Sequence, residues 1–291
     1  MVAAVLTLVP TACIGPSDAE NRFADGVALM EEERYEEAIS EFDSALFLDG
    51  SMAPAFYNRA LAEQQTGKLA AAVNDFTRAI ELSPELAAAY ANRGSIYLRM
   101  GNVEGAVTDL EASLALGEKS AFSHSQLGLA LLNLGRPEHA ITHLDRAIER
   151  DAEYSPAYAN RGIARGRAGE ATLALSGYDK AIELDPKYKL AYTNRASVHL
   201  LQRNLEPAMA DLKKTIELDP ESPSAYVNRG LVLAANGEQL LAVEDFSRAI
   251  QVDPTSLNAY MNRGSAYDDL GRYDDAVSDY SSALNLAPSS A

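Results

Sequence analysis

The chain repeats itself at a fixed interval of 34 residues. Eight units follow one another from Ala19 to Ser290 without insertion or deletion. They start at Ala19, Ala53, Ala87, Ala121, Ser155, Lys189, Pro223 and Leu257. A fixed period of this length is typical of arrays in which one helical unit stacks on the next. Because such arrays present a long continuous surface, the period favours a binding protein over an enzyme with an enclosed pocket.

Each unit contains two apolar runs. In the seventh unit Tyr226 lies four positions before Gly230, and Gly237 separates this run from a second one that contains Phe246. Small and apolar residues spaced three, four and seven apart predict helices, so two runs predict a helical pair. We expect Gly237 to end the first helix and Pro254 to follow the end of the second. Each helix should have about 13 residues and be roughly 20 Å long.

This pattern resembles the tetratricopeptide repeat (TPR) family over residues 19–290. The resemblance implies an all-α fold, an α-solenoid of eight helix-turn-helix TPR units that forms a right-handed superhelix. One departure recurs. Where the family usually has leucine before the glycine of the first helix, this chain has arginine, giving Asn-Arg-Gly or Asn-Arg-Ala.

The asparagine of this motif occupies the slot that points into the concave face in the family. The residues in this slot are Asn58, Asn92, Gln126, Asn160, Asn194, Asn228 and Asn262, with Ala24 in the first unit. The resemblance implies a ladder of carboxamides, similar to the asparagine ladder of O-linked N-acetylglucosamine transferase, which binds extended peptide backbones. An amide can donate and accept a hydrogen bond with a peptide group. The alternative is that these asparagines satisfy helix carbonyls or cap turns.

Two other features concern what the groove would bind. Arg99 and Arg167 follow on the next turn and are expected to bind an acidic residue of a ligand. The lysines that the family uses to clamp chaperone C-termini are missing from the neighbouring rows, so a chaperone-tail binder is disfavoured.

The repeated arginine has a partner at a fixed distance. In five units an aspartate follows it by sixteen residues. The pairs are Arg59 with Asp75, Arg93 with Asp109, Arg195 with Asp211, Arg229 with Asp245, and Arg263 with Asp279. This offset places the two side chains across the facing helices of one hairpin, so we predict a structural ion pair in each. The fourth unit has Leu127 and His143 instead, and the fifth has Arg161 but Gly177.

The fourth unit also concentrates histidines. His139 and His143 are one helical turn apart, a spacing that can chelate a transition metal. Without a third ligand or a nearby cysteine, surface histidines are the favoured interpretation, and no metal site is predicted. This unit is instead expected to change the local curvature or to make a specialised contact.

The formal net charge is −17, which argues against nucleic acid or an anionic bilayer as a direct partner. Acidic residues cluster at 31–37 and at 268–279. We interpret both clusters as solvated surface of the end repeats, and the second lacks the spacing of a calcium loop.

Residues 1–18 lie outside the repeats. They contain a short apolar stretch that ends in small residues and Cys13, the only cysteine of the chain. The stretch is too short to span a bilayer and resembles a signal peptide with a bacterial lipoprotein cleavage site, with Cys13 as the lipidated residue. Pro10 stands where leucine is usual, and no Lys or Arg precedes the apolar run. The alternative is an unprocessed N-terminus on a cytoplasmic protein.

These features predict a non-catalytic scaffold that binds a protein or peptide partner in extended conformation, anchored in the bacterial cell envelope. We find no phosphate loop, nucleophile elbow or metal triad, so neither an enzyme nor a cofactor is predicted. The alternatives are a regulatory subunit of a larger complex and self-association with a second copy.

Overall fold

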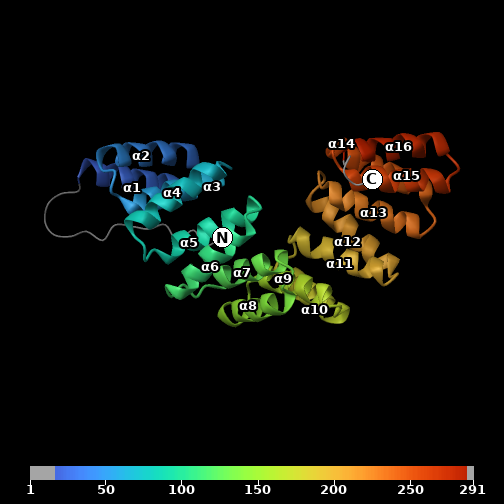
Figure 1. The fold of residues 1–291 in the computed structure, drawn as a ribbon, viewed down its shortest axis with the longest axis horizontal. Coiled ribbons are helices and arrows are strands. Elements are labelled where there is room, and N and C mark those ends of the chain that lie inside the picture. Colours follow the sequence, from blue (N-terminus) through green and yellow to red (C-terminus); the bar gives the residue numbers. More distant parts are fainter. Residues whose placement is uncertain (1–16, 287–291) are drawn as a thin grey trace. The chain divides into compact units, whose positions relative to one another are not determined.

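The computed structural model describes residues 17–286, which form sixteen helices joined by short turns (Figure 1). The chain divides into two compact units, Met1–Ala152 and Glu153–Ala291. The first contains α1 (Asp18–Glu31), α2 (Tyr35–Leu48), α3 (Ala53–Gln65), α4 (Leu69–Leu82), α5 (Ala87–Arg99), α6 (Val103–Ala115), α7 (Ala121–Asn133) and α8 (Pro137–Arg150). The second contains α9 (Ser155–Arg167), α10 (Ala171–Leu184), α11 (Lys189–Leu201), α12 (Leu205–Leu218), α13 (Pro223–Ala235), α14 (Gln239–Val252), α15 (Leu257–Asp269) and α16 (Tyr273–Leu286). The predicted all-α fold with two helices per unit is confirmed.

Each odd-numbered helix packs against the even-numbered helix that follows it, which forms one hairpin per repeat (Figure 1). Within each unit the hairpins stack in chain order, for example through α4 on α5 and through α14 on α15. Odd-numbered helices of successive hairpins also contact each other, as α5 does with α7 and α13 with α15. In the second unit α9, α11, α13 and α15 contact one another in this order and therefore form one continuous layer.

Glycine in the first helix of a hairpin allows close approach of the second. A Cβ atom at Gly230 would lie 2.5 Å from Cε1 of Phe246, whose ring is buried. Gly26 meets Phe42 in the same way at 2.6 Å. Burial of a phenylalanine side chain contributes about 2–3 kcal/mol, so Phe42 and Phe246 form the apolar centres of their own hairpins.

The turn inside most hairpins requires a left-handed backbone. Gly67, for example, has φ +78° and Gly237 has φ +84°. Glycine adopts this conformation without a steric penalty, and its position after the helix matches the prediction. In two hairpins the position is taken by Glu33, with φ 59°, and by Arg203, with φ 62°. A residue with a Cβ atom is strained at these positive φ angles.

The last helix, α16, carries polar residues on its open side, as the terminal repeat of an array requires. The same helix also exposes Tyr273, Val277 and Leu284, which the sequence analysis did not anticipate. Asp279 is only 4% exposed, so its assignment to a solvated acidic cluster is wrong. The other acidic residues of that cluster and those at 31–37 lie at or near the surface.

Candidate functional site

The carboxamides of the N-terminal unit lie inside the packed helices. Asn58 is fully buried and Asn92 is 5% exposed. The Nδ2 group of Asn92 donates to the carbonyl oxygen of Ala88 at 2.9 Å and to the hydroxyl of Tyr57 at 3.1 Å. Asn92 thus satisfies a carbonyl of its own helix, as in the alternative interpretation. A peptide cannot reach Asn58 or Asn92 in this structure, and Gln126 is half-buried.

In the C-terminal unit, most residues of the same slot are less buried. Asn160 on α9 is buried, whereas Asn194, Asn228 and Asn262 are half-buried on α11, α13 and α15. None of these three has a hydrogen-bond partner within residues 17–286, and the Nδ2 atom of Asn194 is buried without one. Because α11 contacts α13 and α13 contacts α15, the three carboxamides follow one another along one helix layer. We call Asn194, Asn228 and Asn262 the carboxamide row.

The difference between the two units follows from the preceding repeat. Tyr57, which is 35 residues before Asn92, supplies the hydroxyl that Asn92 binds. At the same distance before Asn228 is Thr193, whose hydroxyl donates to Lys189 and contacts the hydroxyl of Thr215 at 3.3 Å. Before Asn262 the position is Val227, which has no polar side-chain atom. The amides of the row therefore have no such partner.

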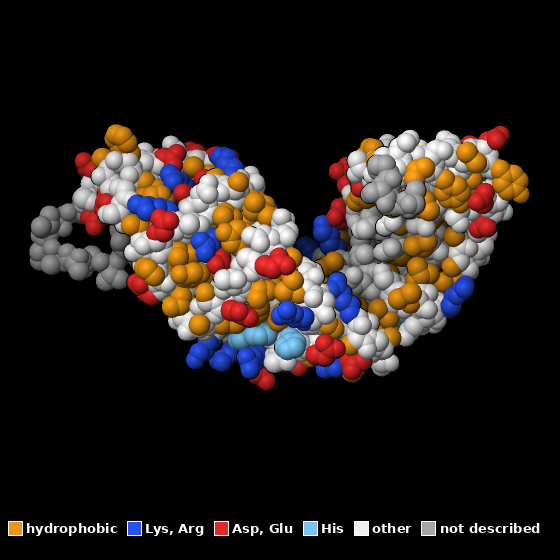
Figure 2. Space-filling model, viewed as in Figure 1, with side chains coloured by type: hydrophobic (Ala, Val, Ile, Leu, Met, Phe, Trp, Pro, Cys, Tyr) orange, Lys and Arg blue, Asp and Glu red, His pale blue; other side chains and the backbone are white. Residues whose placement is uncertain are grey.

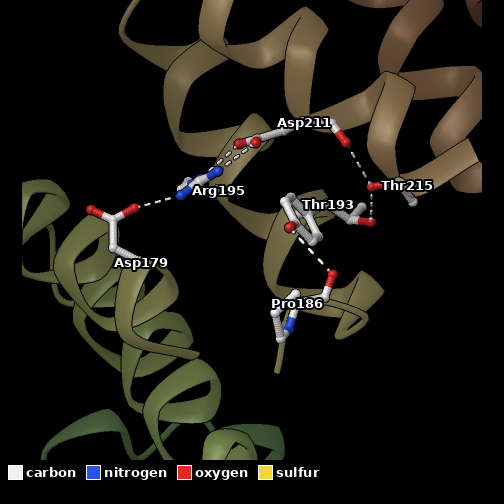
Figure 3. A network of polar contacts seen from close by, with 7 residues as sticks. Asp179, Pro186, Thr193, Arg195, Asp211 and Thr215 are labelled. Carbon is white, nitrogen blue, oxygen red and sulfur yellow. Dashed lines mark hydrogen bonds and ion pairs between the residues drawn. The ribbon is translucent and has the colours of Figure 1, made fainter. Parts of the chain in front are cut away.

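The predicted ion pairs are present in all five hairpins. In each, Nε and Nη2 of the arginine bind the two oxygens of the aspartate at 2.6–2.8 Å. This bidentate geometry is the strong form of a charge-assisted hydrogen bond. Figure 3 shows Arg195 and Asp211 facing each other across α11 and α12. The prediction of a structural pair inside each hairpin is confirmed.

Each of four arginines also makes a third contact that sequence reasoning missed. The Nη1 group of Arg195 binds Asp179 of the preceding hairpin at 2.6 Å (Figure 3). Arg59, Arg93 and Arg263 make the same contact with the residue sixteen positions earlier, which is Asp43, Thr77 and Ser247 respectively. One guanidinium therefore ties together three helices of two successive repeats. We call this arrangement the arginine node. A residue with a side-chain oxygen sixteen positions before the arginine was the sequence signal that could have revealed this third contact.

The remaining predicted site residues lie apart. Arg99 and Arg167 are exposed at the ends of α5 and α9, in different units, so no common site is defined for them. Cys13 lies outside the described residues. Among residues 17–286, no helix is both long and apolar enough to cross a lipid bilayer.

The histidines of the fourth repeat do not follow the predicted arrangement. His139 is exposed, but His143 is half-buried and contacts His124 on α7, with 3.3 Å between their Nδ1 atoms. The interpretation of His143 as a surface residue is therefore wrong, because α8 packs this side chain against α7. No group of three His, Cys, Asp or Glu side chains that could hold a metal occurs in the described part of the chain.

Known proteins share this architecture. Models of the tetratricopeptide repeat match residues 86–120, 125–189, 159–223, 193–256 and 257–290, and a TPR repeat model matches residues 63–101. A TPR protein from Parabacteroides merdae is 19% identical with a TM-score of 0.70, over 86% of this chain and 98% of that one. PilF of Pseudomonas aeruginosa is 21% identical with a TM-score of 0.60, over 70% of this chain and 93% of that one.

A third solved structure, a chain of the APC/C hetero-tetramer Cut9–Hcn1, is 14% identical with a TM-score of 0.71. The match covers 93% of this chain and 53% of that one. At these identities the likeness concerns the fold alone. No curated protein sequence gives a significant match. On its repeat pattern and its family matches, the chain belongs to the tetratricopeptide repeat family, whose helical repeats form scaffolds for protein–protein interactions.

Proposed function

We propose that this protein is a non-catalytic scaffold that binds an extended segment of a partner protein along the carboxamide row. The observation that carries the proposal is the unpartnered state of Asn194, Asn228 and Asn262 at one repeated slot. A buried amide donor without an acceptor is unfavourable by about 1–3 kcal/mol, so a ligand carbonyl at Asn194 would relieve that loss. Successive amides 34 residues apart suit a ligand with a regular series of peptide groups.

The expected affinity is modest. Each new hydrogen bond contributes about 1 kcal/mol net, and ordering a flexible segment costs several kcal/mol. Apolar neighbours add to the interaction, since Leu231 is partly buried and Met261 is 45% exposed beside the row. A dissociation constant of about 1 μM corresponds to roughly 8 kcal/mol, so three hydrogen bonds are not enough and apolar contacts would have to supply most of an affinity in that range.

The test compares capture of partner proteins by two variants of the full chain. One variant combines Asn194→Ala, Asn228→Ala and Asn262→Ala. The matched control combines Asn204→Ala and Asn236→Ala, two exposed asparagines of the same unit outside the slot. We expect the wild type and the control to capture the same proteins from a bacterial envelope extract and the triple variant to lose them. Capture of the same proteins by all three would remove the row as the binding surface.

We further propose that the protein acts in the bacterial cell envelope, attached by a lipid on Cys13. This rests on the apolar stretch before Cys13 and on the small residues around it. Cells grown with radiolabelled palmitate should label the wild type and should not label Cys13→Ser. An unlabelled wild type would overturn the lipid anchor and leave the scaffold proposal standing.

A further inference from the structure

The arginine node is missing from the fourth repeat. Leu127 stands where the second, third and fifth to eighth repeats have arginine, and His143 stands where those six repeats have aspartate or glycine. His124 replaces the aromatic ring three residues before the arginine, over which the guanidinium of Arg59 or Arg195 lies in other repeats. Glu111 occupies the place of the third contact. The side-chain positions that surround a guanidinium elsewhere are thus kept here without the guanidinium.

A cavity of about 440 Å³ occupies this place. Leu127, His124 and His143 line it, together with residues of α6 and of the turn before α7, all in the N-terminal unit. The two imidazoles lie against each other with their ring centres 5.6 Å apart. Leucine is shorter than arginine and has no polar atoms, so it cannot fill the space or satisfy polar groups around it.

Three cations surround this cavity without partners. Lys119, Arg146 and Arg150 line it and are exposed, and none makes an ion pair or hydrogen bond with another residue of the described chain. The arginines of the nodes, by contrast, are each held by a carboxylate. Figure 2 shows lysine and arginine side chains beside histidines on the surface of the molecule. In a chain with a net charge of −17, such a group of unpaired cations is an exception.

Two carboxylates, Glu111 and Glu118, also line the cavity, but neither forms an ion pair with these cations in the described chain. Glu118 accepts a hydrogen bond from the backbone N–H of Ser120 at 2.8 Å, and Glu111 is exposed on α6. Burial, together with His143, Arg146 and Arg150, lowers the pKa of His124 to about 4. Burial, Arg146 and His139 likewise lower the pKa of His143. Both imidazoles are therefore neutral at pH 7, and the charged groups that act on them are basic.

We propose that this cavity binds a doubly charged oxyanion of the phosphoryl type. The three unpaired cations outnumber the two carboxylates of the lining, and a phosphoryl group offers several acceptor oxygens to guanidinium and imidazole N–H donors. A cavity of about 440 Å³ also falls in the range of small-molecule sites, roughly 300–1,000 Å³, so the phosphoryl group of a small ester fits as well as the free ion. A metal ion would be repelled by the same cations. This site is independent of the carboxamide row, which lies in the other unit.

The test is calorimetric titration of the full chain with inorganic phosphate, against chloride at equal ionic strength. We expect phosphate to bind and chloride to give no saturable heat. Arg146→Gln combined with Arg150→Gln should weaken phosphate binding at least tenfold. Arg136→Gln is the matched control, because Arg136 is an exposed arginine of the same unit that lies outside the cavity. It should leave binding unchanged.

A second variant fills the cavity while keeping the repeat folded. Leu127→Arg, His143→Asp and His124→Tyr together recreate the arginine, aspartate and aromatic ring of the other repeats. This variant should keep the helical circular dichroism of the wild type and lose phosphate binding. Titration with glycerol phosphate then distinguishes a site for phosphate esters from a site for the free ion. A site for esters binds glycerol phosphate more tightly than inorganic phosphate. The proposal is overturned if the wild type does not bind phosphate above chloride, or if the filled variant binds it as the wild type does.

Discussion

Removing one partner of an arginine node should destabilise the protein more than removing both. The change is Asp211→Ala, compared with Asp211→Ala combined with Arg195→Leu. Asp211 accepts two hydrogen bonds from Arg195, at 2.8 and 2.6 Å, and its side chain is 7% exposed. The single variant leaves a partly buried guanidinium with two N–H groups unsatisfied. The double variant leaves no buried charge behind, because Asp179, which also loses its partner, is 61% exposed.

The structure sets the expected size of this difference. Breaking a fully buried pair from one side costs about 3–5 kcal/mol. The side chain of Arg195 is 21% exposed and keeps its contact with Asp179, so we expect about 2–3 kcal/mol for the single variant. The double variant should lose about 1 kcal/mol, since replacing both charges by apolar groups is close to neutral. Leucine suits the slot, because Leu127 is 1% exposed in the fourth repeat.

The measurement is urea denaturation followed by circular dichroism. Because repeat arrays can unfold in parts, hydrogen exchange of the α11 and α12 amides should accompany it. The double variant is expected to unfold at a higher urea concentration than the single one. Equal midpoints, or a lower midpoint for the double variant, would refute the argument that the pair is a mutually dependent structural contact.

Three further predictions concern single residues. Burial raises the pKa of Glu63 to about 7, so the folded state holds this proton more tightly than the unfolded state. Stability should therefore fall by about 3 kcal/mol as the pH rises from 4.5 through 7, and Glu63→Gln should remove that part of the urea-midpoint shift between pH 5 and pH 8; an unchanged shift would contradict this. Arg203→Gly should stabilise by about 0.5–1 kcal/mol, because it relieves a left-handed backbone, and a lower melting temperature would contradict it. Gly177→Asp should destabilise by about 1–3 kcal/mol although it restores an aspartate to the fifth repeat, because its Cβ would lie 2.9 Å from the carbonyl oxygen of Tyr158; a higher urea midpoint would show that the backbone can yield.

The sequence predicts those features of the fold that are set within one repeat. Helix ends follow from Gly237 and Pro254, and the pairing of Arg195 with Asp211 follows from the length of one hairpin. Both depend on residues close together in the chain. Their spacing can therefore be read without coordinates.

Features that arise between repeats could not be predicted in the same way. The contact of Arg195 with Asp179 depends on how one hairpin stacks on the previous one. The burial of Asn92 depends on Tyr57, 35 residues earlier, which changes an apparent ladder residue into a structural one. Gly177 was interpreted as a lost partner, but it allows close approach of two helix backbones. Residues at the same position of different repeats therefore have different roles, because the residues that pack against them differ.

The most direct test of the scaffold proposal is an NMR titration of the side-chain amides with the binding segment of a captured partner. Side-chain N–H resonances of Asn194, Asn228 and Asn262 should shift on binding, because their amides gain hydrogen-bond partners. The resonances of Asn92 should stay in place, since its amide is already bound to Ala88 and Tyr57. Unchanged resonances of the carboxamide row in the saturated complex would contradict the account.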